Sequence, residues 1–426
     1  MKIHFIGIGG IGVSGIASVY KQKGHIVAGS DAEPSEVTAD LQKQGIAVFV
    51  GQKASNIAKG IDFVIYSEAV PSNNPELKEA RRLGIKCLSG AEALAELSKD
   101  YFLIAISGMH GKSTTASMIS QILIKAGLDP TFIIGTKPGF RVGKSKYLVI
   151  EADDYQAKFL RYHPDVLVLT NIDAEHLDCL KNMSNIMKIF RQYVSQVKYK
   201  IIANKDNGNV ARLLKNNKKT IFFSLKNQND VKKLRSVLQV PGEHNVSNSL
   251  AALNAARLLK IDDKIAFEAL SKYKGIWRRF QEFSLKIKNQ KLKIISDYAH
   301  HPTEIKATLQ ALKEKYKTEK IVLFFQPHQY QRTYYLWKEF IAVFRQAAGQ
   351  IDKIFITDIY DVKGREDKKI KAKISSQKLV KAIAKPNARY LALAKIQGEF
   401  MPDAINVIMG AGDIYRFPQD KLTNLK

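Results

Sequence analysis

The chain has 426 residues, of which 45% are hydrophobic and 25% are charged. This composition is typical of globular proteins and excludes disordered, collagen-like and disulfide-scaffold classes, while the length predicts about two to four domains. The net charge of +27 favours an anionic partner such as nucleic acid, an acidic membrane or a phosphorylated small molecule.

The lysines are spread over the whole chain, so the excess charge indicates a solvated surface rather than a dedicated polyanion site. The two cysteines, Cys87 and Cys179, lie far apart in sequence, which favours a reducing compartment over a disulfide framework. No apolar run reaches the roughly 18 to 20 residues of a membrane span. We therefore expect a cytoplasmic protein without a signal peptide or membrane insertion.

The first segment predicts a strand at residues 2–6, a glycine turn and a helix at residues 13–22. Gly7, Gly9 and Gly12 form a Gly-x-Gly-x-x-Gly pattern at this turn. Backbone amides at the start of the helix are thereby placed to bind a diphosphate. The alternative is that these glycines serve only close packing of the helix on the strand.

Short strands are predicted at residues 26–28 and 63–66, and Asp31 follows the first of them, 19 residues after Gly12. This is the spacing expected of an acid that binds the ribose of a dinucleotide. Taken alone, the glycine loop and Asp31 favour a nicotinamide-dependent dehydrogenase. We expect this first α/β domain to end near residue 98.

A second α/β unit begins with an apolar strand at residues 101–106, and a helix follows that runs to about residue 126. Further strands alternate with helical stretches, which predicts a parallel sheet. The expected strands are at residues 131–134, 147–150, 166–170 and 200–203, and a helix at 246–259 closes the unit.

The turn between the first strand and helix of this unit has the chemistry of a loop for nucleotide triphosphates. Gly108 and Gly111 let backbone amides converge on phosphate oxygens, and Lys112 offers a charge to the β and γ phosphates. The hydroxyl of Ser113 or Thr114 can reach Mg²⁺. The loop departs from the strict pattern, because an isoleucine stands where the first glycine is expected.

Carboxylates follow two strands of the same unit. The stretch from Glu151 to Asp154 comes directly after one strand, and a stretch containing His176 comes after another. Carboxyl ends of parallel strands share one edge of a sheet, so these groups can meet a metal ion between phosphates. We therefore predict a metal or phosphate role for His176, with a structural histidine as the alternative.

A third α/β unit is predicted from strands at residues 292–296, 321–326, 353–357 and 405–409. Polar clusters at 297–304 and 326–333 follow two of these strands and form an expected ligand-facing rim. Asn245 and Asn248 lie three residues apart at a helix start, where amides either read a base or cap the helix. The predicted domains are residues 1–98, 99–276 and 277–426.

Together, these motifs resemble those of the Mur ligases of peptidoglycan synthesis. The resemblance spans nearly the whole chain, and the order and joint presence of its motifs are highly specific. The motifs are residues 7–15, 108–115, 170–172, 242–248, 278–280, 297–302, 326–333 and 410–413. It implies an N-terminal Rossmann-like domain for a UDP-sugar, a central P-loop domain for ATP and a C-terminal Rossmann-like domain.

The resemblance also implies a reaction and its site residues. ATP and Mg²⁺ would drive the joining of L-alanine to UDP-N-acetylmuramate through an acyl phosphate. The UDP-sugar would be bound by Gly7, Gly9, Gly10, Gly12, Ser30, Asp31 and Ser67. ATP would be bound by Gly108, His110, Gly111, Lys112, Ser113, Thr114, Asn245, Asn248, Arg279 and Asp297.

The remaining implied roles concern the metal, the amino acid and catalysis. The metal ligands would be Ser113, Glu151 and His176. Tyr298, His300, His328 and Arg332 would face the incoming amino acid and the muramoyl carboxylate. The catalytic residues would be Lys112, His176, His300 and Arg332. We expect small-molecule substrates, no nucleic-acid partner, and a monomer or weak homo-oligomer.

The chain departs from the family pattern at several positions. Gln329 stands where the family commonly has arginine, which leaves the amino-acid substrate open. Met109 and Ser113 replace threonines, and Asp154 replaces a glutamate. The alternatives are a ligase that recycles murein peptides, a nicotinamide-dependent dehydrogenase and, last, a basic nucleic-acid-binding protein.

Overall fold

The computed structural model describes residues 1–137, 139–175, 177–287, 290–362 and 366–417. The contacts among these residues divide the chain into two compact units. The first unit comprises Met1–Asp173, Met183–Val237 and Asn248–Ser271. The second unit comprises Ala174–Asn182, Leu238–Ser247 and Lys272–Lys426.

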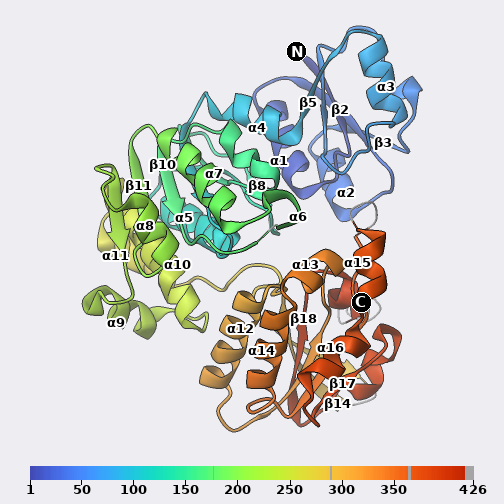
Figure 1. The fold of residues 1–426 in the computed structure, drawn as a ribbon. Coiled ribbons are helices and arrows are strands. Elements are labelled where there is room, and N and C mark those ends of the chain that lie inside the picture. Colours follow the sequence, from blue (N-terminus) through green and yellow to red (C-terminus); the bar gives the residue numbers. More distant parts are fainter. Residues whose placement is uncertain (138, 176, 288–289, 363–365, 418–426) are drawn as a thin grey trace. The chain divides into compact units, whose positions relative to one another are not determined.

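The first unit begins with a parallel sheet of five strands in the order β3-β2-β1-β4-β5, drawn in blue in Figure 1. Its strands are β1 (Lys2–Ile6), β2 (Ile26–Asp31), β3 (Ala47–Val50), β4 (Phe63–Tyr66) and β5 (Lys86–Ser89). Its helices are α1 (Ile11–Gln22), α2 (Glu36–Lys43), the short 3₁₀ helix η1 (Ala54–Asn56), α3 (Pro75–Arg82) and α4 (Gly90–Ser98).

Local sequence accounts for these elements. The central strand β1 is apolar, and Ile3, Phe5 and Ile6 are all buried, as expected of a parallel sheet covered on both faces. Ser35 caps α2 and Ser89 caps α4, each with a reciprocal capping box that satisfies free amides of the first turn.

The second sheet of the same unit has seven strands in the order β12-β11-β10-β6-β9-β7-β8, with only the β7–β8 pair antiparallel among them. The strands are β6 (Phe102–Ser107), β7 (Thr131–Ile133), β8 (Phe140–Arg141), β9 (Tyr147–Glu151), β10 (Val166–Leu169), β11 (Lys200–Asn204) and β12 (Thr220–Phe223). The accompanying helices are α5 (Lys112–Lys125), η2 (Tyr155–Arg161), α7 (Met183–Ser195), α8 (Gly208–Leu214), α9 (Gln228–Val237), α10 (Glu243–Leu258) and α11 (Asp263–Ser271). The first five residues of α10, 243–247, belong to the second unit.

Helix α1 joins the two sheets of the first unit. A side chain at Gly15 would collide with Phe140 of β8, so the absence of a Cβ permits this close approach. An ion pair of 3.0 Å between Lys137 and Glu36 adds a contact between the same two regions. The glycine turn that precedes α1 is thereby held near the second sheet.

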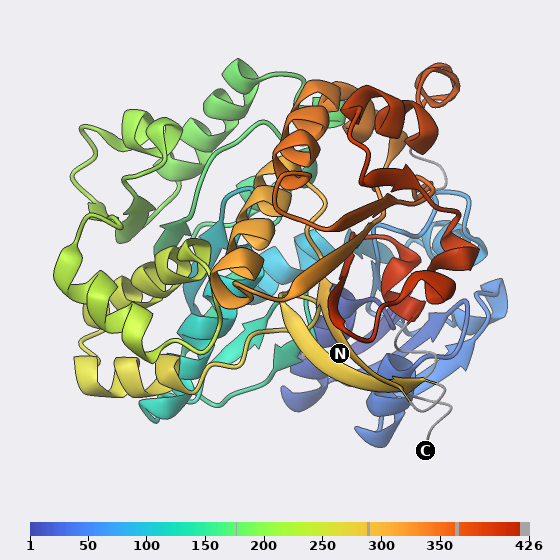
Figure 2. The same cartoon turned by 90° about the horizontal axis from the view of Figure 1, so that it is seen from below.

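The second unit contains a sheet of six strands in the order β13-β14-β18-β15-β16-β17, in which β13 and β14 form an antiparallel pair. Figure 2 shows this pair in yellow. The strands are β13 (Gln281–Ile287), β14 (Gln290–Asp297), β15 (Lys320–Phe325), β16 (Lys353–Ile356), β17 (Ala388–Tyr390) and β18 (Ala404–Met409). The helices are α6 (Leu177–Leu180), α12 (Pro302–Lys315), α13 (Tyr330–Tyr335), α14 (Trp337–Ala347), α15 (Lys368–Lys373), α16 (Ser376–Ile383), η3 (Leu393–Glu399) and η4 (Asp413–Tyr415).

Both faces of the third sheet are buried, which explains its continuous apolar strands. Phe325 packs with Phe340 and Phe344 on the face covered by α12, α14 and α16. Its neighbour Phe324 packs with Phe355 on the opposite face. Successive side chains of a strand alternate between faces, so β15 supplies both cores.

The predicted fold class, three consecutive α/β domains with largely parallel sheets, is confirmed by these three sheets. The predicted central strands agree with the observed ones to within about three residues, whereas β3, β5, β8, β12, β13 and β17 were not predicted. The domain boundaries near residues 98 and 276 stay predictions. Among the described residues, no helix combines the length and apolar character needed to cross a membrane.

Candidate active site

The first glycine loop is folded by its own neighbours. Gly7 has a positive φ of 74°, and its amide donates to the carbonyl of Ser30 at 2.8 Å. The amide of Gly9 donates to Asp31 Oδ2 at 2.8 Å. Asp31 therefore orders the loop, a role that the sequence spacing did not predict.

The remaining residues predicted to bind the UDP-sugar differ in accessibility. Gly10 is the N-cap of α1 and has no side chain to cap it, while a Cβ at Gly12 would meet no atom within 4 Å. Ser67 lies beside Gly7, whose missing Cβ allows this approach. Ser30, in contrast, is fully buried, and its hydroxyl donates to Glu76 at 2.5 Å.

The second glycine loop connects β6 to α5 and needs glycine at two positions. Gly108 has a φ of 125°, and a Cβ there would collide with Thr170 Oγ1. Gly111 has a φ of 81°, and a Cβ there would collide with the side chain of Asn248. At both positions the backbone φ is positive, a conformation that glycine adopts readily and that is strained for other residues.

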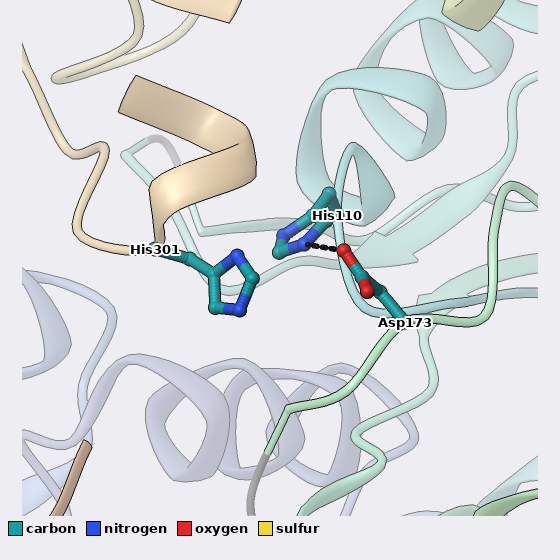
Figure 3. A group of neighbouring side chains, drawn as sticks. All are labelled: His110, Asp173 and His301. Atoms are coloured by element: carbon teal, nitrogen blue, oxygen red, sulfur yellow. Dashed lines mark ion pairs between the residues drawn. The ribbon is translucent and has the colours of Figure 1, made fainter. Parts of the chain in front are cut away.

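The end of β10 fixes this loop from one side. His110 N donates to Asn171 Oδ1 at 3.0 Å, and His110 O accepts from Asn171 Nδ2 at 2.9 Å and from Thr170 Oγ1 at 2.7 Å. His110 Nε2 also lies 3.5 Å from Asp173 Oδ2, and Figure 3 shows the two side chains directed toward one another. The loop is thus preorganised by the neighbouring strand.

Lys112, the first residue of α5, turns its ammonium back over the loop. Its Nζ donates to Gly108 O at 2.7 Å, to Met109 O at 3.2 Å and to Asp154 Oδ1 at 2.6 Å. Burial acts to lower the pKa of Lys112, but the carboxylates of Asp154 and Glu151 outweigh it and raise the pKa above its usual value. Lys112 is therefore positively charged under physiological conditions.

The next hydroxyl of the helix meets the end of β9. Ser113 Oγ donates to Glu151 Oε2 at 2.7 Å, and the same oxygen accepts from Gly135 N at 3.0 Å. A hydroxyl and a carboxylate at this separation are hard oxygen ligands of the kind that Mg²⁺ prefers. Thr114, also in the first turn of α5, is buried. The third predicted metal ligand, His176, lies outside the described residues.

A cavity of ≈ 320 Å³ lies within the first unit and is bordered by the first glycine loop and by the end of β9. The first sheet contributes Gly10, Gly12 and Ser67, and the second contributes Gly135, Glu151 and Lys158. One cavity therefore connects the predicted diphosphate site with Glu151, one of the predicted metal ligands.

The two asparagines of α10 make different contacts. The amide of Asn245 donates to Pro241 O at 2.7 Å, near the start of the helix. Asn248 lies against Gly111 of the phosphate loop. Both side chains are largely buried.

In the second unit, Glu304 organises the start of α12. Its carboxylate accepts from Arg279 Nη1 at 3.3 Å and from His300 N at 3.1 Å, and it belongs to the capping box of that helix. Asp297 is 5% exposed, and its carboxylate accepts from the amides of Phe280 and Ala299, both at 2.8 Å. Burial raises the pKa of Asp297.

Two histidines of this unit, His300 and His328, are held in their neutral form. Burial lowers the pKa of His300 to about 4, and His300 Nδ1 lies 3.0 Å from the carbonyl of Tyr298. A carbonyl can only accept, so Nδ1 carries the proton and Nε2 keeps its lone pair. Burial, and after it the neighbouring His300 ring and Arg332 guanidinium, lowers the pKa of His328 to about 2.

Arg332, on α13, is held by two neighbours. Its Nη1 donates to His328 Nδ1 at 3.0 Å and to His328 O at 3.1 Å, while Nε donates to Glu175 Oε1 at 2.9 Å. Gln329, the N-cap of this helix, has a φ of 72°. Its backbone N–H donates a hydrogen bond to Tyr360 O at 3.0 Å. The second unit thus brings Tyr298, His300, His328 and Arg332 into one cluster.

The sequence did not predict which carboxylates pair with the lysine, arginine and histidine side chains of the candidate site. Asp154 pairs with Lys112, Glu175 with Arg332, Glu304 with Arg279, and Asp173 with His110. The available signal was indirect, because a buried cation needs an anionic partner. Each of these acids lies within a stretch already marked as polar at a strand end.

Two glycine-rich turns at strand ends, one of them with a lysine folded back over the loop, are typical of α/β proteins that bind phosphorylated ligands. Three family models match successive parts of the chain: the Mur ligase family, catalytic domain at residues 2–102; the Mur ligase middle domain at 106–256; and the Mur ligase, glutamate ligase domain at 278–412. The chain belongs to the Mur ligase family.

Two curated relatives carry the same name as each other. The UDP-N-acetylmuramate--L-alanine ligase of Acetivibrio thermocellus is 37% identical, over 97% of this chain and 94% of the relative. The ligase of the same name from Bdellovibrio bacteriovorus is 34% identical, over 100% of this chain and 99% of the relative. The crystal structure of the UDP-N-acetylmuramate-alanine ligase MurC from Thermotoga maritima matches with a TM-score of 0.78 and 26% identity, over 100% of both chains.

A murein peptide ligase from Psychrobacter arcticus also matches, with a TM-score of 0.72 and 23% identity over 100% of this chain and 98% of that chain. At this identity the match shows a shared fold. It does not distinguish between an amino acid and a peptide as the substrate.

Proposed function

We propose that this chain joins L-alanine to the carboxylate of UDP-N-acetylmuramate, with cleavage of ATP to ADP and phosphate. Relatives named for this activity, at 34% to 37% identity over nearly the full length, support the proposal. The structural observation that carries it is the cavity shared by the first glycine loop and Glu151. A UDP-sugar held at the first loop could extend its carboxylate toward ATP held at the second.

The chemistry follows from the poor reactivity of a carboxylate. Its oxygen attacks the γ-phosphorus of ATP, a P–O bond to ADP breaks, and an acyl phosphate forms. The amine of the amino acid then attacks the acyl carbon, phosphate leaves, and the amine gives up its proton. Lys112 would stabilise the charge that develops on the transferred phosphoryl group.

Magnesium is the second part of the proposal, and the donor set supports it. Ser113 and Glu151, with His176, would hold the ion through the hydroxyl, carboxylate and imidazole groups that the sequence places there. When bound, the ion would neutralise charge on the β and γ phosphates. Gly135 N, which donates to Glu151, would keep that carboxylate oriented toward the cavity.

For the nucleotide we propose contacts from two regions. In the first unit, Gly108, His110, Gly111 and Thr114 would surround the phosphates, with Asn248 beside Gly111. In the second unit, Asn245, Arg279 and Asp297 would contribute. Since the carboxylate of Asp297 already binds two backbone amides, we assign it the role of ordering the Arg279 region.

For the UDP-sugar we propose binding by Gly7, Gly9, Gly10, Gly12 and Ser67, with Asp31 ordering their turn. Ser30 would act through its backbone carbonyl, which fixes Gly7, because its side chain is buried.

For the amino acid we propose that Arg332 binds the carboxylate, with Tyr298, His300 and His328 around it. The unprotonated Nε2 of His300 is suited to accept a hydrogen bond from the amine. Gln329 cannot contribute the second positive charge that an arginine would bring, so Arg332 would act alone.

The test is phosphate release from ATP and Mg²⁺ with UDP-N-acetylmuramate, while L-alanine is titrated against glycine, L-serine and a tripeptide that begins with L-Ala-D-Glu. Release that requires both the UDP-sugar and L-alanine supports the proposal. Release only with another amino acid or the tripeptide would keep the ligase chemistry and replace the substrate. Absence of release in all cases, together with nicotinamide reduction, would favour a dehydrogenase instead.

The setting of this reaction is also a proposal. Phosphorylated small-molecule substrates suit a positively charged protein, and we place the enzyme in the cytoplasm, as a monomer or weak homo-oligomer. No nucleic-acid partner is needed to account for the charge.

A further inference from the structure

Asp154 forms a buried ion pair with the lysine of the phosphate loop. The residue has 0% exposure, and its Oδ1 lies 2.6 Å from Lys112 Nζ. The proposed reaction assigns Asp154 no role. We infer that Asp154 is a specificity-determining residue that makes nucleotide binding depend on a divalent cation, and this inference rests on the proposed function.

The first step concerns the hydrogen bonds of the lysine. An ammonium has three N–H donors, and Lys112 uses them on Gly108 O, Met109 O and Asp154 Oδ1. A phosphate oxygen that binds Lys112 must therefore replace one acceptor or share a donor with it. Asp154 is the charged acceptor of the three, so it competes most strongly with a phosphate.

The second step concerns the balance of charge around the loop. Asp154 is the ion-pair partner of Lys112, with 2.6 Å between Oδ1 and Nζ. Glu151 adds a further negative charge near the loop. The hydrogen bonds of its carboxylate are accepted from the Ser113 hydroxyl and the Gly135 amide, which are both uncharged groups. The polyphosphate of a metal-free nucleotide thus meets a lysine that is already neutralised, beside a further carboxylate.

A divalent cation changes this balance, because it brings two positive charges to the carboxylate of Glu151 and to the phosphates together. The nucleotide then no longer depends on Lys112 alone for neutralisation. Asp154 therefore disfavours metal-free ATP more than it disfavours the metal complex. Since only the metal complex supports phosphoryl transfer in the proposed reaction, this discrimination keeps an unreactive ligand out of the site.

Another explanation is that Asp154 merely keeps Lys112 in place. The two explanations predict opposite signs for metal-free binding when the carboxylate is neutralised. If Asp154 competes with phosphate, Asp154→Asn tightens metal-free ATP binding. If Asp154 only positions the lysine, the same change weakens binding or leaves it unchanged.

The experiment measures the Kd of ATP by isothermal titration calorimetry, with either excess Mg²⁺ or a chelator, on the full chain. For Asp154→Asn we expect metal-free ATP to bind about tenfold more tightly, while the Kd with Mg²⁺ changes by less than about threefold. The matched control is Asp153→Asn, which removes the same charge one residue away without touching Lys112. There we expect a change of less than about threefold in both conditions.

Two results would overturn the inference: unchanged or weaker metal-free binding in Asp154→Asn, or an equal shift in Asp153→Asn. Thermal unfolding and UDP-N-acetylmuramate binding report whether each variant is folded, and Asp154→Ser is the second variant if the asparagine is unstable. Wild-type protein that binds no ATP with Mg²⁺ would overturn both this inference and the proposed function. Wild-type binding with an unchanged variant would overturn the inference alone.

Discussion

The phosphate loop of the first unit and the arginine cluster of the second both hold a largely buried cation against a carboxylate. Lys112 lies 2.6 Å from Asp154, and Arg332 Nε lies 2.9 Å from Glu175. The two cations differ in shape. An ammonium is a compact point charge, whereas a guanidinium is a planar fork with five donors in fixed directions.

The difference in shape decides how each site would receive an anion. All three donors of Lys112 are engaged by the protein. Arg332 uses Nε and Nη1 on Glu175 and His328, and within the described part of the chain its Nη2 makes no hydrogen bond. The lysine must exchange a partner to bind phosphate, while the arginine can keep its partners and bind a carboxylate through Nη2. A cation that can exchange its partners, such as Lys112, suits a phosphoryl group that is transferred. A cation with fixed donor directions, such as Arg332, suits a carboxylate that is only held in position.

The largest effect is expected from removing the exchangeable charge. Lys112→Ala should lower phosphate release by roughly a thousandfold or more, because the transferred phosphoryl group loses its main protein cation. UDP-N-acetylmuramate should bind with nearly unchanged affinity, since its proposed loop lies on the other sheet. Steady-state phosphate release and calorimetric binding measure the two properties.

The matched control for this variant is Lys125→Ala. Lys125 ends the same helix and pairs with Glu268 at 2.8 Å, away from the loop. It should keep wild-type turnover. Unchanged phosphate release in Lys112→Ala would remove the loop from the mechanism.

A smaller, more selective effect is expected from changing the shape of the other cation. Arg332→Lys keeps the positive charge but loses the fork that binds Glu175 and His328 while leaving Nη2 available. The KM for L-alanine should rise by about tenfold to a hundredfold, while the Kd of ATP stays the same. Initial rates over a series of L-alanine concentrations test this. A lysine variant with wild-type KM would show that charge alone, rather than direction, binds the amino acid.

The fold was predictable where local sequence and tertiary packing agree. Central strands such as β10, with four buried residues in succession, give a continuous apolar run. The strands that sequence analysis missed are short or partly exposed, as β3 and β8 show. Helix α10 begins at Glu243, three residues before the predicted start, directly after Gly242 with its positive φ of 94°. Such boundaries depend on backbone conformation that apolar periodicity does not report.

The candidate site was predictable in its glycines and its cations, because their spacing reflects backbone geometry. The acids that restrain the cations were not, since a sequence does not reveal where a carboxylate turns after a strand ends. Asp153 and Asp154 illustrate this: they are adjacent and chemically identical, yet one pairs with Lys158 and the other is fully buried against Lys112. Asp31 is a second case, because spacing identified it as a ribose ligand while its carboxylate binds Gly9 N.

The smallest expected effect tests whether the arginine cluster benefits from a second charge. Gln329→Arg restores the cation that the family commonly has at this position, near Arg332 on the same helix start. The KM for L-alanine should fall by about threefold with kcat unchanged, because a partly exposed charge contributes little beyond the buried one. Gln331→Arg is the matched control, because it adds the same charge two residues away on α13. The backbone N–H of Gln331 donates to the carboxylate of Glu366. A rise in KM for Gln329→Arg would mean that the new guanidinium disturbs Glu175 or His328 more than it helps the substrate, and that the fixed direction of Arg332 depends on a neutral residue beside it.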